Sequence, residues 1–242
     1  MSIFFFDIDG TLANGLDVPE SAATALLELR RRGHLVFICT GRPDNYVHEH
    51  FGKYCDGSIC FNGRYAELNG ECLYDYPLTV EQVEEITGIM DDHHCGYLFY
   101  NNEHEFTGGY YDGPYSSMDT HGEEVYNFNI YFDDHKAFET VSEAMKDLCI
   151  FNPHGKAPHA DATVIGSDKG TAIRVVLEKL GIPKEDSYAF GDGANDVCMM
   201  KEVGHGICMG NGLDVTKAVS EYVTTDINDA GIHNALRHYG FI

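Results

Sequence analysis

The sequence is poor in basic residues, with 16 Lys and Arg against 39 Asp and Glu, and its 242 residues carry a formal net charge of −23. Binding to nucleic acid depends on a basic surface that neutralises phosphates, and an anionic membrane repels an acidic protein in the same way. The composition therefore excludes a general nucleic-acid or membrane-surface binder. A phosphorylated ligand of this chain must be small, and a local site or a metal ion must hold it.

The sequence also lacks long apolar runs. Residues 3–6 and 35–39 are among the longest, and a transmembrane helix needs roughly 20 residues. Because the N-terminus has neither the basic region nor the apolar segment of a signal peptide, we expect a cytoplasmic protein. None of the eight cysteines has C-x-x-C spacing, which favours free thiols in a reducing compartment over a zinc or disulfide framework.

Apolar runs alternate with helical patterns in the first and last parts of the chain. Near-continuous apolar strands between helices are typical of a parallel sheet covered on both faces. The dipeptide Asn69-Gly70 adds a hairpin. The expected strands are 3–6, 35–39, 58–61, 187–190 and 206–209, and the expected longer helices are 19–33, 169–180 and 228–238.

The middle of the chain has a different character and predicts an α+β insertion. We expect helices at 80–90 and 135–148 and strands at 96–101 and 128–132, with 104–124 as loop and short strand. The expected domains are therefore a core formed by 1–77 and 166–242 and an insertion formed by 78–165.

Polar side chains gather where the expected strands end. Asp7 and Asp9 follow the first strand, Thr40 follows the second, and Asp192 and Asp196 follow a later one. In an open parallel sheet the ligand crevice lies outside the carboxyl ends of the strands, where the strand order reverses. If the first strand is central, right-handed crossovers place the other two on either side of it, and these groups converge.

Several carboxylates in one crevice repel one another unless they keep protons or surround a cation. A hard, oxygen-preferring ion such as Mg²⁺ fits best. With that charge neutralised, Asp7 can stay ionised and act as a nucleophile, and Asp9 can move a proton beside the same atom. Thr40, the Gly41 N–H and Lys169, near a helix N-terminus, offer partners for phosphoryl oxygens.

Four segments together closely resemble the motifs of haloacid dehalogenase-like (HAD) phosphatases in order and spacing. They are Asp7-Ile8-Asp9-Gly10-Thr11-Leu12, Thr40-Gly41-Arg42, Asp168-Lys169-Gly170 and Gly191-Asp192-Gly193-Ala194-Asn195-Asp196. An insertion between the second and third motifs, just after Phe61-Asn62-Gly63, is similar to the cap of the Cof-type branch. The resemblance implies a doubly wound, HAD-like (Rossmannoid) parallel-sheet core of the α/β class with an inserted α+β cap.

The resemblance also implies a Mg²⁺-dependent phosphatase with a phospho-aspartyl intermediate. Asp7 would be nucleophile and metal ligand, Asp9 would be acid/base and a metal ligand through its backbone carbonyl, and Asp192 would be a metal ligand. The residues that would hold the phosphate are the Ile8 backbone, Thr40, Gly41, Lys169 and Asn195, with Asp196 in support. Arg42 and Asn62 are further candidates for contacts with substrate.

Several interpretations stay open at this stage. The expected substrate is a small phosphorylated metabolite, with sugar phosphates first and pyridoxal phosphate or flavin mononucleotide (FMN) as alternatives. A phosphomutase using the same aspartyl-phosphate, or a non-catalytic metal- or phosphometabolite-binding protein, would share the motifs. Arg42 fits a surface ion pair equally well. Asn62 and Arg64 are candidates to face the leaving group, and a turn asparagine and an exposed arginine fit equally well. His93-His94-Cys95 favours surface or loop residues over a metal site.

Overall fold

The computed structural model describes residues 1–109, 120, 122–153 and 155–242. The chain divides into two compact units, one formed by Met1–Asp75 with Asp168–Ile242 and the other by Tyr76–Ser167. Each boundary lies two residues from the one that the sequence predicts. In the part of the chain that the structure describes, no helix has the length and apolar character needed to cross a membrane.

The first unit is built on one sheet in which the central strands are parallel. The strand order is β13-β12-β11-β1-β2-β3-β4-β5, and only the hairpin strands β4 and β5 run antiparallel to their neighbours. Since the chain moves from β1 to β2 on one side and from β11 to β12 on the other, the strand order reverses beside β1. The strands are β1 (Ile3–Phe6), β2 (Leu35–Cys39), β3 (Gly57–Cys60), β4 (Tyr65–Leu68), β5 (Glu71–Asp75), β11 (Ser187–Gly191), β12 (His205–Cys208) and β13 (Tyr222–Val223).

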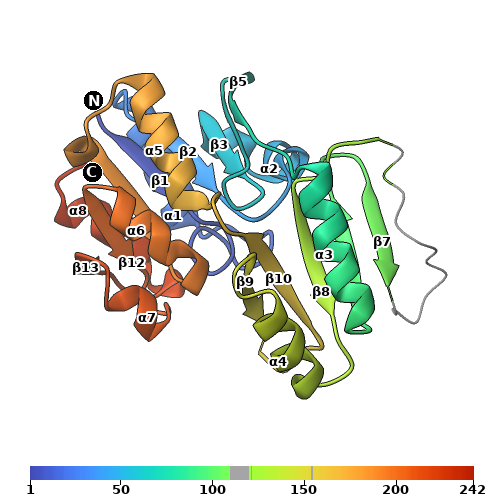
Figure 1. Ribbon diagram of the computed structural model, residues 1–242. Coiled ribbons are helices and arrows are strands. Elements are labelled where there is room, and N and C mark those ends of the chain that lie inside the picture. The colour runs from blue at the N-terminus through green and yellow to red at the C-terminus, as the bar shows by residue number, and fades with distance from the viewer. Residues whose placement is uncertain (110–119, 121, 154) are drawn as a thin grey trace. The chain divides into compact units, whose positions relative to one another are not determined.

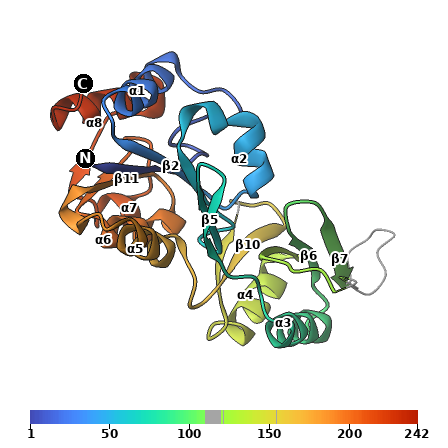
Figure 2. The same ribbon diagram turned by 90° about the horizontal axis from the view of Figure 1, so that it is seen from above.

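Helices cover both faces of this sheet, as Figure 2 shows with α1 and α8 above the strands and α5 and α6 below. Side chains of β1 alternate between the two faces. Phe5 packs in one core cluster with Ile173 of α5 and Met199 of α6, whereas the Phe4 ring lies 4.9 Å from that of Phe241. The helices are α1 (Glu20–Arg31), α2 (Asp44–His50), α5 (Lys169–Leu180), α6 (Val197–Glu202), α7 (Asp214–Lys217) and α8 (Gly231–His238).

The second unit is an antiparallel sheet with two helices on one face (Figure 1). The strand order is β7-β6-β8-β10-β9. Its apolar core joins Met90 of α3 and Val141 of α4 to Phe99 and Phe128, whose rings stack at 4.8 Å. The elements are α3 (Val80–Asp92), β6 (Gly96–Tyr100), β7 (Glu105–Gly109), β8 (Asn127–Tyr131), α4 (His135–Ala144), β9 (Cys149–Pro153) and β10 (His159–Val164).

The α/β class and the doubly wound core are confirmed, and five elements differ from the expectation. β9, β10, β13 and α7 were not predicted, and α4 ends at Ala144 instead of continuing to 148. Part of the expected loop at 104–124 lies outside the described residues. All eight cysteines carry free thiols, in agreement with the reading from their spacing.

Candidate active site

A buried ion-pair network lies at the carboxyl end of β1. Asp7 follows the last residue of the strand and is only 6% exposed. The ammonium of Lys169 donates to Asp7 Oδ1 at 2.6 Å and to Asp196 Oδ1 at 2.7 Å. Lys169 begins α5 immediately after Asp168, whose carboxylate accepts the N–H of Thr171 and caps the helix. The fold thus places one buried cation between two buried carboxylates that are distant in sequence.

The loop after β11 supplies two acidic side chains. One oxygen of Asp196 accepts the backbone N–H groups of Asp192 and Gly193, each at 2.9 Å, and these bonds close the loop. Asp192 Oδ1 accepts the hydroxyl of Thr11 at 2.8 Å. Gly10 has φ +89°, and a Cβ there would stand 2.5 Å from Asp192 Oδ2. Only glycine therefore allows this close approach between the two loops.

Carboxylate oxygens of Asp7, Asp192 and Asp196 lie within 4.8 Å of one another, close enough to hold one cation. Burial, opposed by Lys169 and reinforced by Asp196 and Asp192, raises the pKa of Asp7 to about 8. Burial is also the main cause that raises the pKa of Asp192 to about 6. Burial alone would lower the pKa of Lys169, but Asp196 and Asp7 outweigh it and hold that pKa well above its usual range. The cluster has an excess of negative charge that a divalent cation would offset.

Asp9 lies outside this cluster and is half-exposed. Its carboxylate pairs with the Arg42 guanidinium, with N–O distances of 3.1 and 3.2 Å. The Arg42 guanidinium also lies 5.2 Å from the centre of the Tyr46 ring. Of the two interpretations of Arg42, the structure shows the ion pair, and its partner is the expected acid/base residue.

The loop after β2 lies beside the loop after β3. The buried Thr40 hydroxyl accepts the Arg42 N–H at 3.2 Å. Asn62 is 4% exposed, with its Oδ1 3.1 Å from where a Cβ of Gly41 would stand. Among the described residues, no donor reaches this Asn62 oxygen. Gly63, at φ +101°, lets the same loop approach the Asp168 carbonyl, where a Cβ would clash at 2.2 Å. These contacts bring Asn62 to the start of α5.

Two further expected residues lie in the adjoining loops. The Ile8 carbonyl accepts the N–H groups of Leu12 and Ala13 at 3.0 and 2.9 Å, which folds the loop after β1 back on itself. Asn195 is half-buried in a short helix, Ala194–Asp196. Of the two interpretations of Arg64, the exposed one is wrong, because its side chain is among the largest fully buried ones.

The contact between Thr11 and Asp192 was not predicted from the sequence. Thr11 is fully buried and donates its hydroxyl to Asp192 across 181 residues of sequence. A threonine in a loop at a strand end gives no signal of a specific partner. Only the pairing of β1 with β11 shows which carboxylate it orients.

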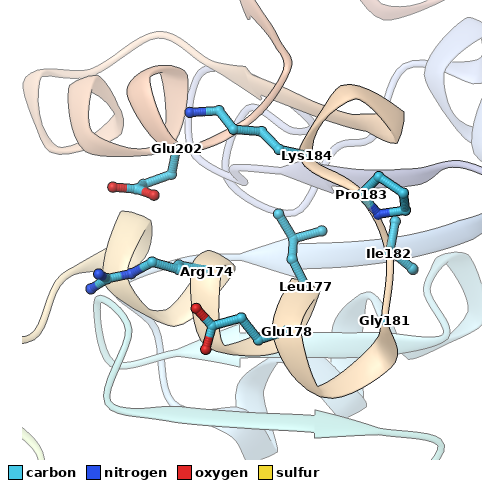
Figure 3. Close-up of a pocket in the computed structure, with 8 residues that line it drawn as sticks. All are labelled: Arg174, Leu177, Glu178, Gly181, Ile182, Pro183, Lys184 and Glu202. Carbon is cyan, nitrogen blue, oxygen red and sulfur yellow. The ribbon is translucent and has the colours of Figure 1, made fainter.

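A pocket elsewhere on the first unit has a different composition (Figure 3). It has a volume of about 430 Å³ and lies along the second half of α5, with Lys184 and Glu202 facing Arg174 and Glu178. Charged side chains of both signs surround apolar Leu177 and Ile182. Because none of the residues of the carboxylate cluster lines this pocket, we assign it no part in the chemistry.

Comparisons with known proteins identify the family of this chain. The family model of haloacid dehalogenase-like hydrolases matches residues 4–236. The chain is 28% identical to the putative phosphatase YkrA of Bacillus subtilis, over 99% of this chain and 98% of that protein. It is 26% identical to the B. subtilis 5-amino-6-(5-phospho-D-ribitylamino)uracil phosphatase YcsE, over 99% and 96%. A solved structure of a HAD subclass IIB sugar phosphatase aligns with a TM-score of 0.82 at 26% identity, covering both chains completely.

The chain therefore belongs to the haloacid dehalogenase-like hydrolase family. The resemblance drawn from the four motifs is confirmed, and so is the assignment to the phosphatases of this family.

The raised pKa values predict how a divalent cation will act on stability. A carboxyl group whose pKa is higher in the folded state contributes stability that is fully present below its unfolded pKa and is lost as pH rises through the folded pKa. For Asp192 and Asp7 the unfolded pKa is near 3.8, and the folded values are about 6 and about 8. In EDTA, stability should fall over this range, and Mg²⁺ should offset the loss. Melting temperatures measured against pH should show a Mg²⁺ increment that grows with pH. An increment that is equal at all pH values would contradict this account of the cluster.

Proposed function

We propose that this chain hydrolyses phosphate monoesters of small metabolites, with Asp7 as nucleophile and Asp9 as acid/base. The observation that carries the proposal is the buried network in which Lys169 joins Asp7 and Asp196 at the carboxyl end of β1. It supports a nucleophile held at a fixed position beside a positive charge, which is what transfer of a dianionic phosphoryl group requires.

The donor set fits Mg²⁺. The Asp7 and Asp192 carboxylates and the Asp9 backbone carbonyl would hold the ion, and all are the oxygen ligands that this hard cation prefers. The raised pKa values of Asp7 and Asp192 are the expected property of carboxylates that are poised for a cation. When bound, Mg²⁺ supplies positive charge against the phosphoryl oxygens.

The chain's own residues divide the chemistry between two half-reactions. An Asp7 oxygen attacks phosphorus in line, the bond to the leaving oxygen breaks, and Asp9 gives that oxygen its proton. Asp9, now a carboxylate, then takes a proton from water as the water attacks phosphorus and releases Asp7. Arg42 pairs with the Asp9 carboxylate in this structure. This pair must separate, and Asp9 must take up a proton as substrate binds, before Asp9 can give that proton to the leaving oxygen.

Other side chains bind the phosphoryl group. Lys169 supplies the positive charge, and Thr40, Gly41, Asn195 and the Ile8 backbone supply hydrogen bonds, with Asp196 holding Lys169 in place. The acceptor Asn62 Oδ1, buried and unsatisfied among the described residues, suits a hydroxyl donor on the leaving group. This preference supports a polyhydroxylated substrate.

Sugar phosphates are the substrate class that we place first. A subclass IIB sugar phosphatase shares the fold over the full chain, and YcsE acts on a phosphorylated ribitylamino compound. Pyridoxal phosphate and FMN remain the alternatives. We assign the choice among them to the second unit, Tyr76–Ser167, in the manner of a specificity cap.

The test is phosphate release from a panel of sugar phosphates, pyridoxal phosphate, FMN and p-nitrophenyl phosphate, measured in Mg²⁺ and in EDTA. We expect release that EDTA abolishes and Mg²⁺ restores, with the highest kcat/KM on a sugar phosphate. Release that persists in EDTA would contradict the metal assignment. Isomerisation of a sugar phosphate without free phosphate would instead identify a mutase.

A further inference from the structure

Asp44, His48 and Glu67 form a second cluster of potential metal ligands in the first unit. Asp44 and His48 lie one turn apart on α2, and Glu67 lies on β4. One ligand atom from each lies within 4.8 Å of the other two. The three residues have no part in the proposed phosphatase chemistry.

The distances in this cluster suit a shared cation better than direct hydrogen bonds. His48 Nε2 lies 3.3 Å from Asp44 Oδ2 and 3.7 Å from Glu67 Oε1. A charge-assisted hydrogen bond between imidazolium and carboxylate is about 2.7–2.9 Å long. In a tetrahedral site with metal–ligand bonds of about 2.0–2.2 Å, the ligand atoms are about 3.4 Å apart. The two observed separations bracket this tetrahedral value.

Each carboxylate is oriented from outside the cluster. The Ser58 hydroxyl donates to Asp44 Oδ1 at 2.8 Å, and the backbone N–H of Gly70 donates to Glu67 Oε2. In each carboxylate, the oxygen that does not accept this hydrogen bond is the one that faces His48 Nε2: Oδ2 of Asp44 and Oε1 of Glu67. Supporting donors of this kind fix the ligands of protein metal sites.

Exposure differs across the cluster and leaves its imidazole side open to an ion. The Glu67 side chain is only 4% exposed and the Asp44 side chain 13%, whereas that of His48 is 52% exposed. The exposed imidazole side leaves a path for an ion from solvent and room for water as a fourth ligand.

We propose that Asp44, His48 and Glu67 bind one transition-metal dication of the zinc type, separately from the carboxylate cluster around Asp7. An imidazole among the ligands favours Zn²⁺ over Mg²⁺, which takes oxygen ligands. The bound ion joins α2 to β4. Since Asp44 lies two residues after Arg42, the ion also fixes the start of the helix that follows the phosphate-binding loop.

The experiment measures Zn²⁺ stoichiometry and affinity by equilibrium dialysis in EDTA-treated, re-dialysed full-length protein. All variants carry Asp192→Asn, which weakens the carboxylate cluster around Asp7, and excess Mg²⁺ occupies what remains of it. We expect one Zn²⁺ per chain in this background. Loss of a residue that only supports a ligand lowers metal affinity by about 10- to 100-fold. Because His48→Gln and Glu67→Gln each remove a ligand, their Zn²⁺ affinity should fall by more than that.

The matched control is His50→Gln, which removes the other histidine of the same helix and should leave binding unchanged. Ser58→Ala retains all three ligands and should weaken binding by about 10- to 100-fold, so the test survives if the His48 variant fails to fold. Co²⁺ provides a second readout, because its visible absorption is much stronger in a four-coordinate site than in a six-coordinate one.

No Zn²⁺ bound in the Asp192→Asn background, or equal binding in the His48→Gln and His50→Gln variants, would overturn the proposal. The measurement needs no substrate and no turnover. A failure of the proposed phosphatase function would therefore leave this result intact, and the reverse also holds.

Discussion

Replacing Asp7 with Asn should abolish turnover while the protein stays folded. The amide cannot attack phosphorus, and loss of a catalytic nucleophile lowers kcat by roughly 10⁴-fold or more. The same change removes one of three clustered carboxylates. Burial of Asp7 raises its pKa to about 8, which means that its charged form is unfavourable in the folded protein. The melting temperature in EDTA should therefore equal or exceed that of the wild type. Phosphate release and thermal unfolding, measured on the same preparation, test both parts.

Asp17→Asn is the matched control, because it makes the same change at an exposed aspartate ten residues further along the chain. It should retain wild-type kcat. Substantial activity in Asp7→Asn would refute the nucleophile assignment, and a large loss of stability there would refute the account of the cluster's charge.

Replacing Asp9 with Asn should slow turnover of sugar phosphates by about 10²- to 10⁴-fold, the usual contribution of a general acid or base. Folding should be unaffected, because Asp9 and Arg42 are 46% and 49% exposed and surface ion pairs contribute little. p-Nitrophenolate leaves without needing a proton, so the first step should stay fast on p-nitrophenyl phosphate. Stopped-flow absorbance should show a burst of p-nitrophenol close to one equivalent, followed by slow release.

The burst distinguishes an acid/base role of Asp9 from a role in substrate binding. If Asp9→Asn merely weakened substrate binding, KM would rise and no burst would form. Wild-type turnover in this variant would remove Asp9 from the acid/base role.

The convergence of the site residues could be predicted because it depends on simple periodic signals. The apolar runs before Asp7, Thr40 and Asp192 mark strands whose polar successors meet at one edge of a parallel sheet. The observed order β11-β1-β2 places them as that rule requires. The expected helix 169–180 coincides with α5, which Asp168 caps at its N-terminus and Gly181 ends in the left-handed conformation.

Contacts between side chains from separate loops could not be predicted in the same way. Arg64 is buried by the fold around β4, although its sequence neighbours suggest a turn. The pairing of Arg42 with Asp9 depends on how far the two loops extend beyond their strands. Glu67 meets α2 only because the β4 hairpin pairs with β3. The spacing of Asp44 and His48, one helical turn, was the available signal for that cluster.

The strands β9 and β10 were missed for a different reason. In β10 the buried positions are Ala160, Ala162, Thr163 and Val164, and alanine and threonine carry little of the hydrophobic contrast that marks a strand. β9 is an edge strand that ends at Pro153, a residue that usually argues against a strand interior. Both strands are specified by their pairing in the sheet more than by their own composition.

The most direct test of the central claim is chemical trapping of the phosphorylated residue. Asp9→Asn enzyme with Mg²⁺ and p-nitrophenyl phosphate would be quenched with borohydride, which reduces an aspartyl phosphate to homoserine, and its peptides would be analysed by mass spectrometry. The account predicts homoserine at position 7, dependent on substrate and Mg²⁺. Trapping at another residue, or none from an enzyme that shows the burst, would contradict it.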